Sequence, residues 1–108
     1  MNYTIKPNHE TLKLICDLYD VSKGQFDKEQ LDLSEIKYLE VLEDLLGEMI
    51  VKFKKKLLEN KSAYQFQLKK YQVYFLSRFI YENYEKYQGI FEKTLMRKFA
   101  DRMDIQLC

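Results

Sequence analysis

Residues that build small proteins around disulfides or metal ions are scarce in this chain. Of its 108 residues, two are cysteine and one is histidine. Two thiols as far apart as Cys16 and Cys108 do not make a disulfide framework, and His9 alone cannot complete a two-histidine metal site. We therefore expect reduced thiols, a cytoplasmic location, and neither a metal ion nor another cofactor.

Glycine and proline are also rare, with three residues and one residue, which argues against a sandwich of short strands joined by many turns. Gly24, Gly47 and Gly89 stand alone, so the chain has no glycine-rich loop to hold a phosphate. A composition that is 46% hydrophobic and 32% charged is typical of a helix-rich globular protein. At this length we expect one hydrophobic core and one helical domain spanning residues 1–108.

The chain has neither a surplus of one charge nor a long apolar run. Eighteen basic residues against seventeen acidic ones leave a net charge of +1, so no overall field attracts nucleic acid or an anionic membrane. No apolar stretch approaches the roughly 20 residues that cross a bilayer, and the amino-terminal residues lack the apolar core of a signal peptide. We expect no membrane association, and nucleic-acid binding would have to come from a local patch.

Capping signals and apolar periodicity predict four main helices. Asn8 suits the N-cap of the first helix, and Asp32 with Glu35 and Ser62 with Gln65 have the capping-box spacing that begins a helix. A very short connection between the second and third helices favours an antiparallel hairpin. The predicted fold is all-α, a compact bundle of about four main helices on this central hairpin. The helices run from Asn8 to about Gly24, from Asp32 to Asn60, from Ser62 to Tyr87, and onward from Gly89.

The expected inward faces follow steps of three and four residues. In the second helix the inward face is Ile36, Leu39, Leu42, Leu45, Leu46, Met49, Ile50, Phe53 and Leu57. In the last helix the apolar stripe is Phe91, Leu95, Phe99 and Met103. Gly47 lies inside the second helix, where it weakens the helix, and we interpret it as the mark of a close helix crossing.

The third predicted helix carries nine aromatic residues between Ser62 and Tyr87. At about 100° per residue they cannot share one face. One stripe would be Tyr64, Leu68, Tyr71, Phe75 and Phe79, and the opposite stripe Phe66, Val73, Leu76, Ile80, Tyr84 and Tyr87. Tyrosine joins an apolar ring to a polar tip, which suits either a core rim or a protein interface. Both alternatives stay open for the interface candidates, Tyr74, Tyr81, Tyr84 and Tyr87.

A run of lysines is the second binding candidate. Seven positive charges would gather at one end of the hairpin, near Tyr64 and Tyr71, and such an arrangement can hold phosphates and stack bases. The plainer alternative is that lysines in the last turns of a helix complement its dipole. The full run is Lys52, Lys54, Lys55, Lys56, Lys61, Lys69 and Lys70, of which Lys54, Lys55, Lys56, Lys69 and Lys70 are the nucleic-acid candidates.

Residues suited to catalysis are few. A cysteine buried in a helix, such as Cys16, behaves as a small hydrophobe more often than as a nucleophile. The carboxylate pairs Asp17 with Asp20 and Asp101 with Asp104 have the spacing of ordinary solvated helix faces. We therefore predict a protein that is not an enzyme and has no catalytic residue.

The predicted function is that of a small protein-binding adaptor, inhibitor or regulatory subunit that docks through its tyrosine-bearing helix face. The alternatives are a nucleic-acid-binding accessory protein that uses the Lys52–Lys70 patch, and a structural subunit of a larger assembly. Several tyrosines exposed together would also permit a homo-oligomer. The high content of Lys, Tyr, Asn and Gln resembles that of small proteins from low-GC bacteria and their phages.

Overall fold

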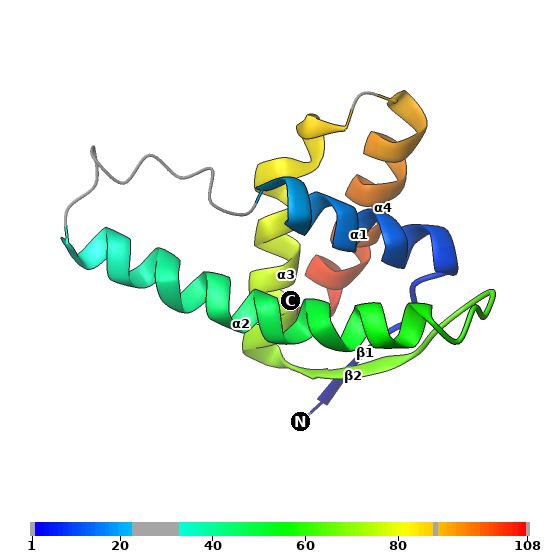
Figure 1. Ribbon diagram of the computed structural model, residues 1–108, viewed down its shortest axis with the longest axis horizontal. Helices are drawn as coiled ribbons and strands as arrows, with labels where there is room; N and C mark the ends of the chain where they lie inside the picture. The colour runs from blue at the N-terminus through cyan, green and yellow to red at the C-terminus, as the bar shows by residue number, and fades with distance from the viewer. Residues whose placement is uncertain (1, 23–32, 88, 108) are drawn as a thin grey trace.

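The computed structural model describes residues 2–22, 33–87 and 89–107, with the side chains in these ranges except those of residues 33–36, 38, 39 and 42. These residues form four α-helices, one short 3-10 helix and a two-stranded sheet (Figure 1). The mostly helical, compact fold is confirmed, whereas the all-α class omits the sheet. The elements are β1 (Asn2–Ile5), α1 (His9–Ser22), α2 (Leu33–Leu57), β2 (Phe66–Lys69), α3 (Lys70–Asn83), η2 (Tyr84–Lys86) and α4 (Ile90–Leu107).

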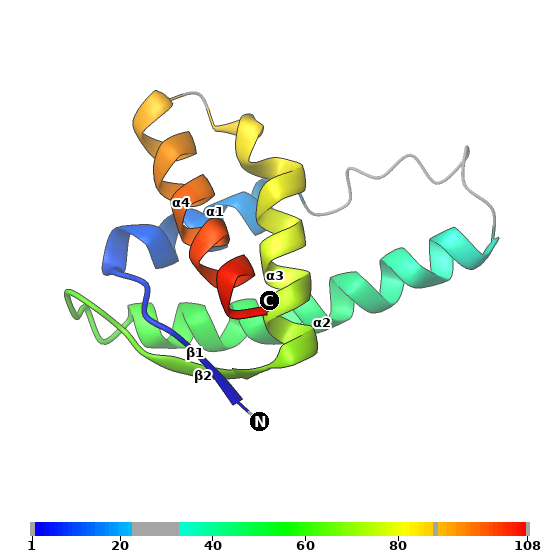
Figure 2. The same ribbon diagram turned by 180° about the vertical axis from the view of Figure 1, so that it is seen from behind.

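Two antiparallel helices, α3 and α4, form the centre of the molecule, and the short helix η2 lies between them in sequence (Figure 1). α1 crosses one side of this pair, as the view from behind shows (Figure 2). α2 passes across the end of the pair where α3 begins, and the sheet lies against α2. The predicted hairpin of residues 32–60 with residues 62–87 is not confirmed, because the antiparallel neighbours are α3 and α4.

The predicted helix start at Ser62 is wrong. Residues 62–65 are not helical, and the next four residues form strand β2. Helix α3 begins only at Lys70, where the Gln72 side-chain oxygen accepts a hydrogen bond from the Lys69 backbone N–H at 2.8 Å. The reach-back bond of a capping box is therefore made by Gln72 and not by Gln65. A strand partner from the amino terminus outweighs the local helix signal here.

Strands β1 and β2 pair antiparallel, with Tyr3 opposite Leu68 and Ile5 opposite Phe66. Because opposite residues share a face of the sheet, these four side chains all turn toward the core. Ile5 and Leu68 are buried there, while Gln67 on the other face is exposed. The sheet therefore has one apolar and one polar face, as half-buried antiparallel sheets do.

The segment between β1 and α1 is tied to the segment that follows α2. The backbone N–H of His9 donates to the Ser62 carbonyl at 3.1 Å, and the N–H of Tyr64 donates to the Pro7 carbonyl at 2.9 Å. The predicted cap of α1 is confirmed, because the Asn8 side-chain oxygen accepts a hydrogen bond from Thr11 N–H at 2.7 Å. The caps predicted at Gly24 and Asp32 lie outside the described residues, as do Cys108 and the side chain of Glu35.

The core draws on every helix and on the sheet. The inward face predicted for α2 is confirmed for Leu46, Met49, Ile50 and Phe53, while Leu45 and Leu57 are partly buried. The side chains of Ile36, Leu39 and Leu42 lie outside the described set. In α4 the predicted stripe is confirmed only toward the carboxyl end, at Phe99 and Met103. Its buried face is Met96, Phe99, Ala100 and Met103.

Phe91 was predicted to lie on that buried face, but it is 62% exposed. It stands in the first turn of α4, beyond the part of the helix that packs against the core. The apolar periodicity of a helix identifies a face, but the length of its neighbours decides how much of that face is covered.

Gly47 lies where α2 crosses α1, as its sequence context indicated. A Cβ atom at this position would lie 3.1 Å from the Tyr19 hydroxyl oxygen. The Tyr19 ring in turn contacts Phe79 of α3 edge-on, with ring centroids 6.3 Å apart. A larger side chain at Gly47 must therefore displace Tyr19.

We expect Gly47→Leu to lower the free energy of unfolding by about 1–3 kcal/mol, because the leucine side chain overpacks the α1–α2 crossing. Urea denaturation of the purified chain measures this change. Glu48→Leu adds the same side chain at the adjacent exposed position and is expected to change stability by less than about 0.5 kcal/mol. Equal effects of the two substitutions would show that the crossing is not tightly packed.

Candidate functional site

Three of the four candidate interface tyrosines lie at the rim of the core. Tyr81, Tyr84 and Tyr87 are partly buried and pack against the buried cluster. The Tyr81 hydroxyl donates to the Asp101 carboxylate of α4, and the Tyr87 hydroxyl donates to the Leu14 carbonyl of α1. Tyr81 and Tyr87 therefore use both the ring and the polar tip inside the molecule.

Burial raises the pKa of Tyr87 well above the ordinary tyrosine value, and the nearby Asp17 charge raises it further. Burial also raises the pKa of Tyr81 to about 12, with the hydrogen bond to Asp101 as the second cause. Both effects disfavour the phenolate form. The two hydroxyls are thus protonated hydrogen-bond donors: Tyr81 joins α3 to α4, and Tyr87 joins the segment after η2 to α1.

Tyr74 differs from the other three because 45% of it is exposed. Tyr71, one helical turn earlier, is 44% exposed. The partly buried Phe75 contacts both rings, with centroid distances of 6.3 Å to Tyr71 and 5.8 Å to Tyr74. The Arg78 guanidinium lies 6.0 Å from the Tyr74 ring centroid, within cation–π range. Two exposed rings are thus held in place by side chains of their own helix.

These two tyrosines line a hollow between the start of α3 and the end of α4. We call it the aromatic hollow; its volume is about 700 Å³ and it is lined by Lys70, Tyr71, Tyr74, Asp104 and Leu107. Most of its surface is apolar, and one charged residue of each sign stands in its wall. A concave apolar surface with a few polar groups is the usual form of a binding site.

The candidate lysines do not form one patch. Lys54 pairs with Asp20 of α1 at 2.9 Å, and this hydrogen bond raises the pKa of Lys54. Lys55 is exposed at the end of α2. Lys69 and Lys70 stand at the far end of β2, because the strand runs back along α2 before α3 begins (Figure 1). Lys70 lines the aromatic hollow instead.

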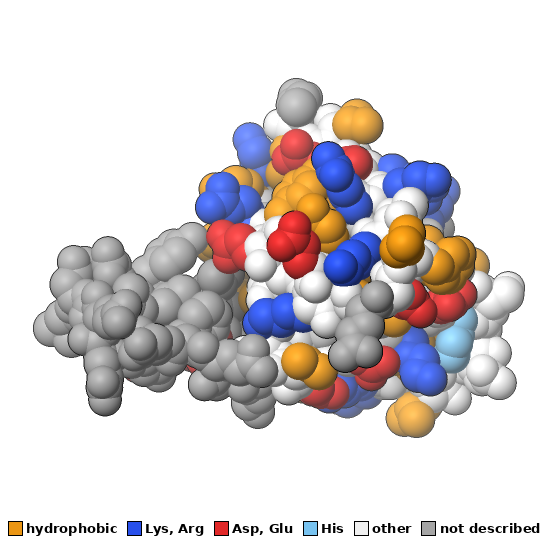
Figure 3. Space-filling view, turned by 90° about the horizontal axis from the view of Figure 1, so that it is seen from above, with side chains coloured by type: hydrophobic (Ala, Val, Ile, Leu, Met, Phe, Trp, Pro, Cys, Tyr) orange, Lys and Arg blue, Asp and Glu red, His pale blue; other side chains and the backbone are white. Residues whose placement is uncertain are grey.

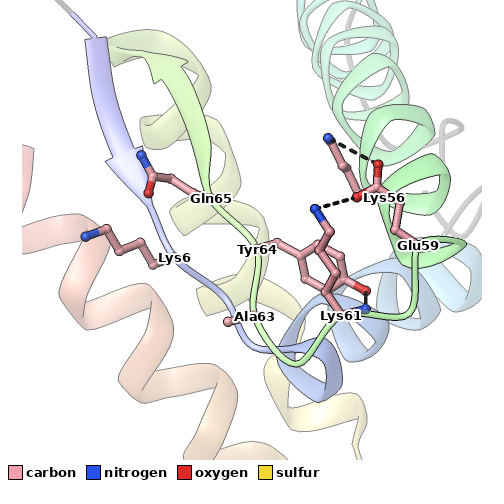
Figure 4. A pocket seen from close by; sticks show the side chains of 7 residues that line it. All are labelled: Lys6, Lys56, Glu59, Lys61, Ala63, Tyr64 and Gln65. Carbon is pink, nitrogen blue, oxygen red and sulfur yellow. Dashed lines mark hydrogen bonds and ion pairs between the residues drawn. The ribbon is translucent and has the colours of Figure 1, made fainter.

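Lys56 belongs to a second hollow, of about 450 Å³, at the end of α2 (Figure 4). Glu59 stands between Lys56, at 3.5 Å, and Lys61, at 3.1 Å. The hydrogen bond from Lys61 is the main cause that lowers the pKa of Glu59. We call this the basic hollow. Its walls are Lys6, Lys56, Glu59, Lys61, Ala63, Tyr64 and Gln65.

Tyr64 is only 6% exposed in the wall of the basic hollow. Its hydroxyl accepts a hydrogen bond from the Lys61 backbone N–H at 3.0 Å and lies 2.9 Å from the His9 Nδ1 atom. The ring is therefore part of the core and offers no open face for stacking a base. Lys6, which the sequence did not indicate, reaches this hollow because strand pairing brings its segment beside Gln65 (Figure 4).

The residues best suited to nucleophilic chemistry are not arranged for it. Cys16 is 3% exposed, and burial raises the pKa of its thiol to about 12. The reactive thiolate is therefore strongly disfavoured. The Nδ1 atom of the His9 ring is hydrogen-bonded to the Tyr64 hydroxyl. Among the described residues, no three histidine, cysteine or carboxylate side chains lie together as the ligands of a metal ion would.

Comparison with known proteins gives no relative. No family model matches the chain, and no significant match is found among curated proteins or solved structures. In the part of the chain that the structure describes, every helix is too short or too polar to span a membrane.

Proposed function

We propose that this protein is not an enzyme and works by binding another protein through the aromatic hollow. The observation that carries the proposal is the pair Tyr71 and Tyr74, nearly half exposed and held side by side above an apolar depression. Tyrosines are enriched among the residues that dominate binding energy at protein interfaces. The class that we propose is a cytoplasmic adaptor, inhibitor or regulatory subunit.

The rings are suited to this role because they are already ordered. Phe75 contacts both, and Arg78 lies near Tyr74 while its guanidinium also pairs with Glu82 at 3.3 Å. Ordering an interface side chain costs about 0.5–1.5 kcal/mol, and a ring that is already packed loses less on binding. An apolar side chain of the partner, inserted between the rings and Leu107, would bury the hollow.

The nucleic-acid alternative has less support. The candidate lysines are divided between two ends of β2, and Lys54 and Lys56 already pair with carboxylates. On the face seen from above, basic and acidic side chains are interspersed (Figure 3). Such a mixture does not make the continuous positive groove that binds a nucleic-acid strand without sequence preference.

Affinity capture from the native host tests the proposal. We expect the double substitution Tyr71→Ser and Tyr74→Ser to reduce recovery of the partner at least about tenfold, since interface tyrosines commonly contribute more than 1 kcal/mol each. The melting temperature of each variant is measured as well, because both rings also pack against Phe75 and their loss is expected to lower stability to some extent. Phe91→Ser, at an exposed aromatic position elsewhere, is the matched control and should keep the partner.

Recovery of the same proteins by the double variant would refute docking at this hollow. Light scattering of the purified chain tests the remaining alternative, a structural or self-assembling subunit. A concentration-dependent mass that the double variant abolishes would identify the partner as a second copy. Salt-sensitive retention on DNA or RNA, lost when Lys54, Lys55 and Lys56 are replaced by Gln, would favour the nucleic-acid function.

A further inference from the structure

A third hollow lies beside strand β1, on a surface that the proposed function does not use. It has a volume of about 190 Å³ and is formed by three consecutive residues of the amino-terminal segment and one face of α4. None of the residues that line it belongs to β2, and its opposite wall is α4. Its walls are Thr4, Ile5, Lys6, Phe99, Arg102, Met103 and Gln106.

The strand that borders this hollow is an edge strand. Within the described residues the sheet has two strands, and β1 pairs with β2 along one edge only. Every second residue of such a strand turns its backbone N–H and C=O away from its partner. An extended peptide can pair with these groups and add a strand to the sheet, with a side chain placed in the adjoining groove.

The chemistry of the walls selects the kind of peptide. The lining is mixed: Ile5, Phe99 and Met103 supply its apolar part and are almost fully buried, with exposures of 2%, 6% and 1%. Lys6 and Arg102 stand exposed at the rim, and the lining residues include no carboxylate. Lys6 also lines the basic hollow, where Lys61 is paired with Glu59. A segment with acidic side chains complements this rim.

We propose that the outer edge of β1 binds an extended, acidic peptide segment of a partner protein as a third strand. Its backbone pairs with β1, an apolar side chain enters the hollow above Met103, and its carboxylates lie against Lys6 and Arg102. A single-stranded nucleic acid fits less well. The two rings that line these hollows, Phe99 and Tyr64, are both more than nine-tenths buried and offer no stacking surface.

Fluorescence anisotropy on the full chain tests this inference with short labelled peptides of alternating glutamate and valine. We expect the glutamate peptide to bind and the same peptide with lysine for glutamate not to bind. The double substitution Lys6→Gln and Arg102→Gln should weaken binding at least about fivefold. Lys98→Gln removes a charge from an exposed position of α4 outside the hollow and should leave affinity unchanged.

Backbone methylation distinguishes strand addition from simple charge attraction. Two peptides are compared, one N-methylated at the odd-numbered residues and one at the even-numbered residues. Only one of the two should lose binding, because an edge strand pairs with alternate amides. Hydrogen exchange should show new protection at the amides of β1. Failure of the acidic peptide to bind, or equal loss of binding by both methylated peptides, would overturn the proposal.

Two further measurements distinguish a peptide site at β1 from a nucleic-acid site and from the aromatic hollow. The first is the affinity for single-stranded oligothymidine. If oligothymidine binds more tightly than the acidic peptide, and the Lys6 and Arg102 double variant no longer binds it, the hollow is a nucleic-acid site and the peptide proposal is overturned. The Tyr71→Ser and Tyr74→Ser double variant should bind the peptide normally. The two sites can therefore fail or succeed independently.

Discussion

Replacing Phe53 by alanine is expected to lower the free energy of unfolding by about 3–5 kcal/mol, the usual cost of deleting a buried phenylalanine ring. Phe53 is 1% exposed, and its ring centroid lies 4.7 Å from that of Phe66. The pair joins α2 to β2. Loss of the ring removes buried apolar surface and leaves a cavity at the junction of the helix and the sheet.

Equilibrium urea denaturation, followed by far-ultraviolet circular dichroism, measures this effect. Val51→Ala changes an apolar residue of the same helix that is 53% exposed, and it should cost less than about 1 kcal/mol. A loss of stability below about 1 kcal/mol for Phe53→Ala would contradict the packing described for this junction. Phe66→Ala should weaken the same junction less, because Phe66 is only partly buried.

Stability is expected to fall steeply in alkaline solution. Folding raises the pKa of Cys16 from 9.0 to about 12 and that of Tyr81 from 10.0 to about 12, and it raises that of Tyr87 as well. Burial is the main cause for all three. Between the unfolded and folded pKa values, the unfolded chain has released protons that the native chain keeps. Each such proton lowers the free energy of unfolding by about 1.4 kcal/mol per pH unit.

Because the folded-state pKa values are raised, stability is lost as the pH increases. Stability from these groups is fully present below about pH 9, and it declines first through Cys16 and then, above about pH 10, through the tyrosines. Urea denaturation between about pH 8 and about pH 11 measures the slope. Tyr87→Phe removes one of the titrating groups and should make the decline shallower, while Phe91→Leu removes no titrating group and should leave it unchanged. Identical slopes for both variants would exclude Tyr87 as a source.

Local signals predicted the parts of the fold that depend on near neighbours in sequence. Asn8 caps α1 through a bond to a residue three positions later, and Phe53 belongs to a stripe that three- and four-residue steps define. Gly47 was also interpretable, since a glycine inside a strong helical pattern needs a packing reason. In each case the sequence signal lies within one or two turns of the residue, although the contact that explains Gly47 comes from Tyr19 of α1.

The sheet could not be predicted in the same way, because its two strands come from distant parts of the chain. Phe66 to Lys69 does alternate apolar and polar residues, which is a strand pattern, but a four-residue alternation also fits a helix. The presence of β1 decides between them. The same pairing brings Lys6 to the basic hollow, which explains why the sequence did not indicate that residue.

Which tyrosines are buried and which are exposed also depends on contacts between distant parts of the chain. Tyr81 and Tyr87 have hydroxyls that find acceptors on α4 and α1, and those helices are placed by tertiary packing. Helical projection gave the direction of each ring but not its neighbours. Tyr74 stays exposed together with Tyr71, which the projection had placed on one stripe with Phe75 and Phe79.

The antiparallel pairing of β1 with β2 also orders events during synthesis. The partners of Tyr3 and Ile5 lie more than 60 residues later in the chain, so β1 leaves the ribosome long before β2 exists.

The aromatic hollow needs Leu107 as well as Tyr71 and Tyr74. A partner that docks in this hollow therefore cannot select the nascent chain before residue 107 has emerged.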